Sequence, residues 1–185
     1  MADKFRVAVL VGSLRTESRN RKVAHELVAR AGDALDCGFV EIGDLPLYNE
    51  DLETADPPAA WQRLRGEIAT SDAVLFVSPE YNRSVPGALK NAIDVGSRPP
   101  RQSVWTGKPA MIVTASPGAI GGFGSSQIIR QSLVAVGMPV LAQPEVYLSR
   151  VSDLFDPDGR MVASTGEFLG KAMQAFAAWI ARFKD

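Results

Sequence analysis

The chain has 185 residues, of which 46% are hydrophobic and 22% are charged, and this balance is that of a globular protein rather than a disordered one. Twenty lysines and arginines face 21 aspartates and glutamates, which argues against a general nucleic-acid binder and against an electron carrier that docks through a strongly acidic surface. One cysteine and one histidine exclude an intramolecular disulfide, a thiolate metal cluster and the usual zinc ligands. Chemistry beyond acid–base catalysis therefore requires a bound organic cofactor.

Length and hydropathy also indicate where the protein works. No apolar stretch reaches the roughly 18 residues that a membrane helix needs. The first residues, MADKFR, lack the pattern of a signal peptide. We therefore expect a cytoplasmic protein without membrane insertion, folded as a single domain over residues 1–185.

Short apolar runs alternate along the chain with stretches of helical periodicity. The runs of strand length are residues 5–11, 37–42, 72–78, 108–116 and 138–148. The helical stretches are residues 19–31, 57–71, 87–97, 125–137 and 166–183. In the last of them, the core-facing side chains are expected to be Phe168, Leu169, Met173, Phe176 and Ile180. The alternation predicts an α/β protein, a three-layer α/β/α sandwich with a five-stranded parallel sheet.

The most polar or glycine-rich loops follow the first, third and fourth predicted strands. They read GSLRTES (12–18), PEYNRSVP (79–86) and SPGAIGGFG (116–124). In open parallel sheets, ligands bind beyond the carboxyl ends of the strands, at the point where the strand order reverses. We therefore expect these three loops to converge on one crevice.

The first loop, within VGSLRTESRN (11–20), has the composition of an anion site. Free backbone N–H groups at the start of the following helix, together with the helix dipole, favour a phosphate or carboxylate. Side chains that can donate hydrogen bonds to such an anion are Ser13, Arg15, Thr16, Ser18 and Asn20. The loop is neither GxxxxGK[ST] nor GxGxxG, which favours a mononucleotide over a nucleoside triphosphate or a dinucleotide. The alternative is that Ser18 only caps the helix and Arg15 is a solvated charge.

Three motifs together resemble the NADPH-dependent FMN reductase family, and most closely its bacterial quinone and chromate reductase branch. They are GSLRTESRN after the first strand, PEYNRSVPGALKNAID after the third, and SPG followed by GG after the fourth. The resemblance spans nearly the whole chain, with the motifs in the same order. It implies a flavodoxin-like fold, bound FMN, NAD(P)H as electron donor, and a homodimer or homotetramer.

The resemblance also implies roles for individual residues. The FMN phosphate would be bound by Ser13, Arg15, Ser18 and Asn20. The isoalloxazine ring and the ribityl chain would be contacted by Pro79, Glu80, Tyr81 and Asn82. Part of a third loop that contacts the flavin would be formed by Ser116, Pro117 and Gly118. Glycines at positions 118, 121, 122 and 124 would permit a close approach of the backbone to the ring. Position 83, often aromatic in such relatives, is Arg83 here, and a cation at this substrate edge would favour anionic acceptors or NADPH.

The implied activity is that of an FMN-dependent NAD(P)H:acceptor oxidoreductase. Hydride would pass from NAD(P)H to N5 of the flavin and then to a quinone in a ping-pong reaction, with chromate, azo and nitro compounds as adventitious acceptors. No catalytic side chain and no metal is required. Two alternatives stay open: a flavodoxin-type electron-transfer module that serves a protein partner, and a non-redox mononucleotide binder. The sequence leaves open the choice between NADH and NADPH, the acceptor, and dimer against tetramer.

Overall fold

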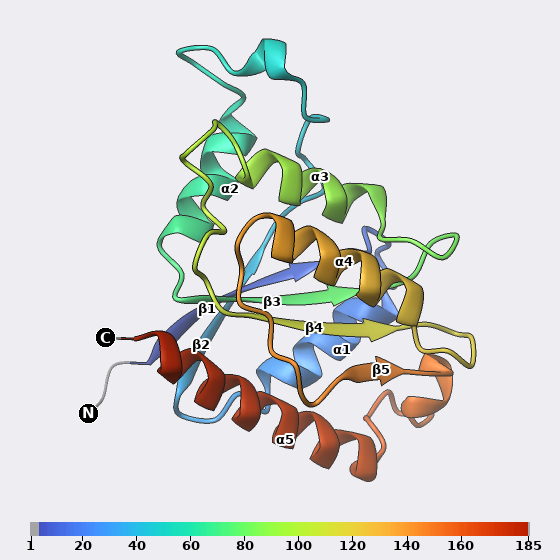
Figure 1. Ribbon diagram of the computed structural model, residues 1–185. Helices are drawn as coiled ribbons and strands as arrows, with labels where there is room; N and C mark the ends of the chain where they lie inside the picture. The colour runs from blue at the N-terminus through green and yellow to red at the C-terminus, as the bar shows by residue number, and fades with distance from the viewer. Residues whose placement is uncertain (1–3, 185) are drawn as a thin grey trace.

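The computed structural model describes residues 4–184, and Figure 1 shows one twisted sheet between two layers of helices. The strands are β1 (Phe5–Val11), β2 (Leu35–Val40), β3 (Ala73–Ser78), β4 (Ala110–Ala115) and β5 (Val146–Leu148). All neighbouring pairs are parallel, in the order β2-β1-β3-β4-β5. This order is that of the flavodoxin-like, doubly wound sheet, and it confirms the predicted fold class.

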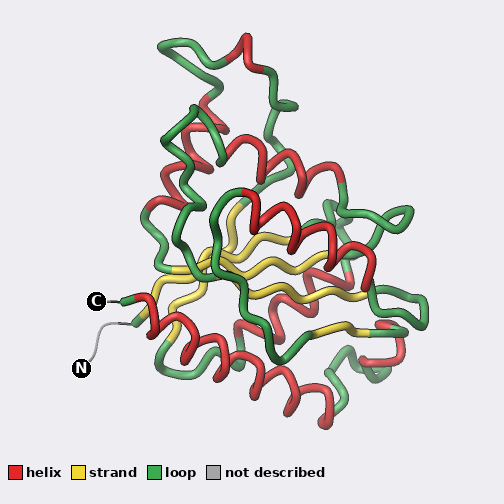
Figure 2. The backbone as a smooth tube through the Cα atoms, in the orientation of Figure 1, coloured by secondary structure: helices red, strands yellow, loops and turns green. Residues whose placement is uncertain are grey.

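The helices divide between the two faces of the sheet (Figures 1 and 2). One face is covered by α1 (Arg19–Val28) and α5 (Ala163–Ile180), whose apolar side chains share a core cluster with the strands. The other face is covered by α2 (Ala59–Ala69), α3 (Gly87–Gly96) and α4 (Phe123–Ala135), around a second cluster. Strand β3 is buried along its whole length, because Leu75 and Val77 enter the first cluster while Val74 and Phe76 enter the second.

The first strand has the predicted range, the third is one residue shorter, and both ends of the fourth lie within two residues of the prediction, whereas the second and the fifth differ more. The fifth covers only Val146–Leu148 instead of 138–148, because Pro139 and Pro144 have no N–H to donate to a ladder. A single bridge from Val140 to Ala110 is what remains of the pairing before it. The second strand runs over Leu35–Val40 rather than 37–42, since its register pairs Leu35 with Phe5.

The helices follow the prediction closely, with one wrong core residue. Their ends differ from the expected ones by no more than three residues. In α5, Leu169, Met173, Phe176 and Ile180 are buried as expected, whereas Phe168 is 38% exposed. Phe168 lies about 100° around the helix from Leu169, which takes it off the stripe that faces the sheet.

Within residues 4–184, no helix combines the length and the apolar character that crossing a membrane requires.

Candidate functional site

A cleft of about 240 Å³ lies where β1, β3 and β4 end. Its walls come from the three loops that the sequence predicts to converge, and this prediction is confirmed. The lining residues are Ser13, Arg15, Ser18, Arg19, Asn20, Pro79, Glu80, Tyr81, Ala115, Pro117 and Val151.

The first loop brings three polar side chains into a buried wall of the cleft. Ser13, Ser18 and Asn20 are only 4%, 3% and 5% exposed. The Ser18 hydroxyl accepts a hydrogen bond from the Arg21 backbone N–H (3.1 Å) and so caps α1. Because Ser18 also lines the cleft, capping and ligand binding are compatible at this residue. Arg15 is exposed at the cleft, and its guanidinium is free to reach an anion there.

Asn20 has a buried acceptor that the fold leaves without a partner. Its Nδ2 donates to the Ala115 carbonyl (3.2 Å), which ties the first turn of α1 to the end of β4. Its Oδ1 is the one buried side-chain polar atom among the described residues without a hydrogen-bond partner. An unpaired buried acceptor is costly, and a ligand that carries a hydroxyl donor would satisfy it.

The second loop forms a tight two-residue turn at the rim. Tyr81 and Ser84 exchange both backbone hydrogen bonds, at 3.1 and 3.0 Å. The two central residues, Asn82 (φ +50°) and Arg83 (φ +64°), are both left-handed, as a type I′ turn requires. Asn82 and Arg83 do not belong to the cleft lining, whereas Tyr81, 46% exposed, does.

The third loop is fastened to a segment that sequence reasoning missed. The Val151 N–H donates to the Ser116 carbonyl and the Arg150 N–H to the Gly118 carbonyl, both at 3.0 Å. Pro117 and Val151 then lie together in the cleft wall. Val151 follows β5 between the polar residues Arg150 and Ser152, and its apolar side chain carries no group that indicates ligand binding, so its position was not predicted.

Two glycines of the third loop allow close packing against neighbouring residues, and a third leaves room for a ligand. Gly121 (φ +65°) lies so close to Tyr147 that an added Cβ would come within 2.7 Å of its backbone carbon. Gly122 (φ +83°) has the same relation to Thr114, whose hydroxyl donates to the Gly121 carbonyl (2.8 Å). By contrast, a Cβ on Gly118 would meet only the Ser116 hydroxyl at 3.8 Å, which leaves Gly118 open for a ligand.

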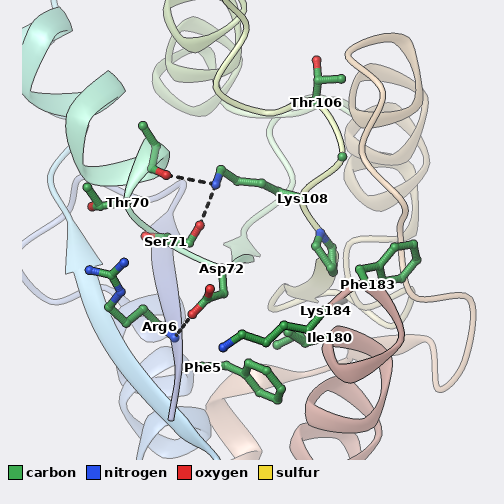
Figure 3. Close-up of a pocket in the computed structure, with 13 residues that line it drawn as sticks. Phe5, Arg6, Thr70, Ser71, Asp72, Thr106, Lys108, Ile180, Phe183 and Lys184 are labelled. Atoms are coloured by element: carbon green, nitrogen blue, oxygen red, sulfur yellow. Dashed lines mark hydrogen bonds between the residues drawn. The ribbon is translucent and has the colours of Figure 1, made fainter. Parts of the chain in front are cut away.

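A larger cavity of about 400 Å³ lies at the opposite, amino edge of the sheet (Figure 3). Two of its charged lining residues, Lys108 and Asp72, are bonded to the backbone of the fold. The Lys108 ammonium donates to the carbonyls of Ala69 (3.2 Å) and Ser71 (2.6 Å), and burial lowers its pKa. The Asp72 carboxylate accepts from the Arg6 backbone N–H (2.7 Å). Lys108 thus caps carbonyls at the C-terminus of α2, and Asp72 joins β1 to the start of β3. We therefore assign this cavity a structural role.

The one thiol of the chain lies away from the cleft. Cys37 lies on β2, outside the lining, and burial together with the nearby Asp36 carboxylate raises its pKa to about 11, so the thiol is protonated at neutral pH. Over residues 4–184, the His, Cys, Asp and Glu side chains form no group of three or more that could hold a metal ion.

The fold is flavodoxin-like, and the cleft lies at the switch point between β1 and β3, where ligands bind in such sheets. Residues 5–153 match the family described as NADPH-dependent FMN reductase. The quinone reductase of Pseudomonas putida KT2440 is 57% identical over 180 residues, which are 97% of each chain. Among solved structures, FerB, a flavoenzyme NAD(P)H:(acceptor) oxidoreductase from Paracoccus denitrificans, superposes with a TM-score of 0.90 at 42% identity, covering 97% of this chain and 98% of that one. A flavodoxin, WrbA-like protein from Agrobacterium tumefaciens (TM-score 0.67, 16% identity, 98% and 100% covered) shares the fold.

The chain therefore belongs to the NADPH-dependent FMN reductase family, as its three motifs predicted. It is an oxidoreductase that uses FMN and NAD(P)H.

Proposed function

We propose that this enzyme reduces quinones with electrons from NAD(P)H, and that FMN binds in the cleft at the carboxyl edge of the sheet. The observation that carries the proposal is the unpaired Asn20 Oδ1 in the buried wall, next to the capped N-terminus of α1. Such a wall suits a ligand with an anionic end and adjacent hydroxyls. FMN has both, and when bound it supplies the two-electron redox centre that the side chains lack.

The phosphate of FMN would lie at the start of α1. The first turn of this helix contains no acidic residue, so its free N–H groups and dipole favour an anion there. Ser13 and Ser18 would donate from the buried wall and Arg15 from the exposed side. Arg19, which also lines the cleft, would add a second cation.

Asn20 would serve the ribityl chain rather than the phosphate. One of its amide hydrogens is used by the Ala115 carbonyl, and its free atom is an acceptor that a ribityl hydroxyl can satisfy. We infer that the ring would then lie against Tyr81 and Pro117 at the other end of the cleft. In these two loops the N–H groups of Tyr81 and Ser116 already donate to backbone carbonyls, and Pro117 has none. The backbone N–H groups of Glu80, Asn82 and Gly118 would therefore face the polar edge of the ring and favour the reduced cofactor.

Arg83 is proposed to act at the substrate edge. Its side chain is 73% exposed, and the left-handed turn holds it beside the cleft rather than inside it. A cation there would attract NADPH and anionic acceptors such as chromate, with azo and nitro compounds as further acceptors.

We also propose a cytoplasmic homodimer or homotetramer. The single cysteine leaves no intramolecular disulfide to form, which suits a reducing compartment. Large apolar side chains stand on the surface, with Leu47 at 79%, Ile120 at 52% and Phe123 at 47% exposure, as expected where subunits meet.

Anaerobic titration followed by steady-state kinetics tests the function. We expect the protein loaded with FMN to lose its visible flavin absorbance on addition of NADPH or NADH, before any quinone is present, and to recover it when a quinone is added. If neither nicotinamide bleaches the flavin, the reductase proposal is wrong and a module fed by a protein partner is favoured. Purified protein that cannot be loaded with FMN would favour a non-redox mononucleotide binder.

A further inference from the structure

Glu80, in the second loop, does not have a free carboxylate. Its side chain is only 11% exposed, although it belongs to a rim loop. One oxygen, Oε2, accepts a hydrogen bond from the Ser125 backbone N–H (3.2 Å), and the other, Oε1, accepts from the Arg83 guanidinium (3.3 Å). Both oxygens are therefore committed to protein groups.

The partner at Oε2 is the N-terminus of α4. This helix begins after Gly122, which is left-handed and has no side chain with which to cap the free N–H groups. Ser125 is the third residue of the helix, and its N–H has no carbonyl four residues back within the helix. A carboxylate from another loop thus takes the place of a local cap, and its negative charge suits the positive end of the helix dipole.

Two further contacts hold the turn over residues 79–84, and the residue before it, against the N-terminus of α4. Gly124 packs so closely that an added Cβ would lie 2.9 Å from both Glu80 Oε2 and the Arg83 carbonyl oxygen. The buried hydroxyl of Ser78, the last residue of β3 before the turn, lies 3.3 Å from the hydroxyl of Ser125. The turn over residues 79–84 is therefore docked on α4 through backbone, side chain and shape.

We propose that Glu80 is a positioning residue whose carboxylate holds the turn of residues 79–84 on the first turn of α4. We call this contact between the Glu80 carboxylate and the first turn of α4 the clamp. Because α4 continues directly from the third cleft loop, the clamp fixes the two loops that border the ring end of the cleft. The inference rests on the proposed binding of FMN in this cleft. Glu80 then acts on the cofactor through the spacing of the two loops and not through a direct hydrogen bond.

Three variants separate a positioning role of Glu80 from a direct hydrogen bond between Glu80 and the cofactor. Glu80→Ala removes the acceptor. Glu80→Gln keeps an oxygen that can accept from the Ser125 N–H. Gly124→Ala leaves Glu80 intact but forces the turn away from α4, and alanine favours a helix more than glycine does. A matched control is Glu53→Ala, since Glu53 is another carboxylate, 13% exposed, that is paired with an arginine (Arg65) outside the cleft.

The first readout is FMN affinity, measured by titrating apoprotein with FMN and following flavin fluorescence. We expect Glu80→Ala and Gly124→Ala to raise the Kd about tenfold, the loss of one charge-assisted contact. Glu80→Gln should stay within about threefold of the wild type, and Glu53→Ala within about twofold. Wild-type affinity in Gly124→Ala, or equal losses in Glu80→Gln and Glu80→Ala, would overturn the clamp.

The second readout does not need the cofactor. Amide hydrogen exchange of the apoprotein reports the Ser125 N–H directly, and its protection should fall about tenfold in Glu80→Ala while it is unchanged in Glu53→Ala. Unchanged protection of Ser125 in Glu80→Ala contradicts the clamp. Failure of wild-type protein to bind FMN contradicts the proposed function instead, so the two failures are distinguishable.

Discussion

The two edges of the sheet carry cavities of opposite character. The amino edge has the larger of the two, about 400 Å³, yet two of its charged lining residues, Lys108 and Asp72, bond to the backbone around them. The carboxyl edge has a cleft of about 240 Å³ whose buried wall contains the unpaired Asn20 Oδ1. We therefore take the buried unsatisfied acceptor, rather than the larger volume, as the mark of the candidate functional site.

The two edges also differ in how they use glycine. At the carboxyl edge, left-handed Gly121 is pressed against Tyr147 and holds the third cleft loop in place. At the amino edge, Gly107 is also left-handed, but an added Cβ there would meet nothing within 4 Å. The same backbone conformation thus carries a packing constraint at one edge only.

The largest expected effect contrasts two arginines. Arg15→Ala, at the cleft, should weaken FMN binding about a hundredfold, because a charge-assisted contact to the phosphate is lost. Arg6→Ala, an exposed arginine in the amino-edge cavity, should leave FMN binding unchanged. Fluorescence titration of the two apoproteins measures both. Comparable losses of FMN affinity in the two variants would contradict the placement of the FMN site at the carboxyl edge. A large drop in the rate of hydride transfer in FMN-loaded Arg15→Ala would show that Arg15 does more than anchor the cofactor.

The next prediction concerns the two glycines. Gly121→Ala should lower the free energy of unfolding by about 3 kcal/mol, from left-handed strain together with the clash at Tyr147. Gly107→Ala should cost only the strain, about 1 kcal/mol. Urea denaturation gives both values. FMN affinity should fall in Gly121→Ala alone, and an equal cost at the two positions would mean that the third loop is not held as the contacts indicate.

A smaller effect is expected from the helix cap. Ser18→Ala removes the acceptor for the Arg21 N–H and should lower the free energy of unfolding of the apoprotein by about 1 kcal/mol. It should also weaken FMN binding several-fold, because the hydroxyl lies in the cleft wall. A loss of stability without any loss of FMN affinity would leave Ser18 with capping as its only role.

An effect on stability alone is expected from Lys108→Met at the amino edge. The carbonyls of Ala69 and Ser71 lose their donor, so the free energy of unfolding should fall by about 1 kcal/mol at neutral pH, while FMN affinity and turnover are unchanged. Burial lowers the pKa of Lys108 in the folded state below its ordinary value of 10.5. Just below that value the unfolded chain therefore binds more protons than the folded one, and wild-type stability gains relative to Lys108→Met as the pH rises towards 10.5. A constant difference between the two proteins across this range would contradict the buried environment of Lys108.

Much of this architecture could be predicted from the sequence, because buried parallel strands and amphipathic helices leave periodic signals. Strand β3 was predicted to within one residue, since both of its faces are apolar. The fifth strand was not, because a run containing Pro139 and Pro144 retains apolar character while losing ladder donors. The convergence of the three loops followed from topology alone.

The details of the site were harder to predict, because they depend on contacts between distant segments. The sequence indicates that Glu80 belongs to a flavin loop, yet only the structure shows its carboxylate on the Ser125 N–H, 45 residues further along the chain. Arg19, Ala115 and Val151 in the cleft wall were not predicted. Arg19 lies in the segment predicted to bind an anion but was not assigned a contact, and the apolar side chains of Ala115 and Val151 carry no group that indicates ligand binding. The assignment of FMN atoms to individual residues stays a prediction.

The most direct test of the account is the amide NMR spectrum of the apoprotein during titration with FMN. We expect the largest shift changes within residues 13–20, 79–84 and 115–118, including the side-chain amide of Asn20, and no change at residues 69–72 and 106–109 of the amino edge. Shifts concentrated at the amino edge, with residues 13–20 unmoved, would contradict the assignment of the FMN site to the carboxyl edge.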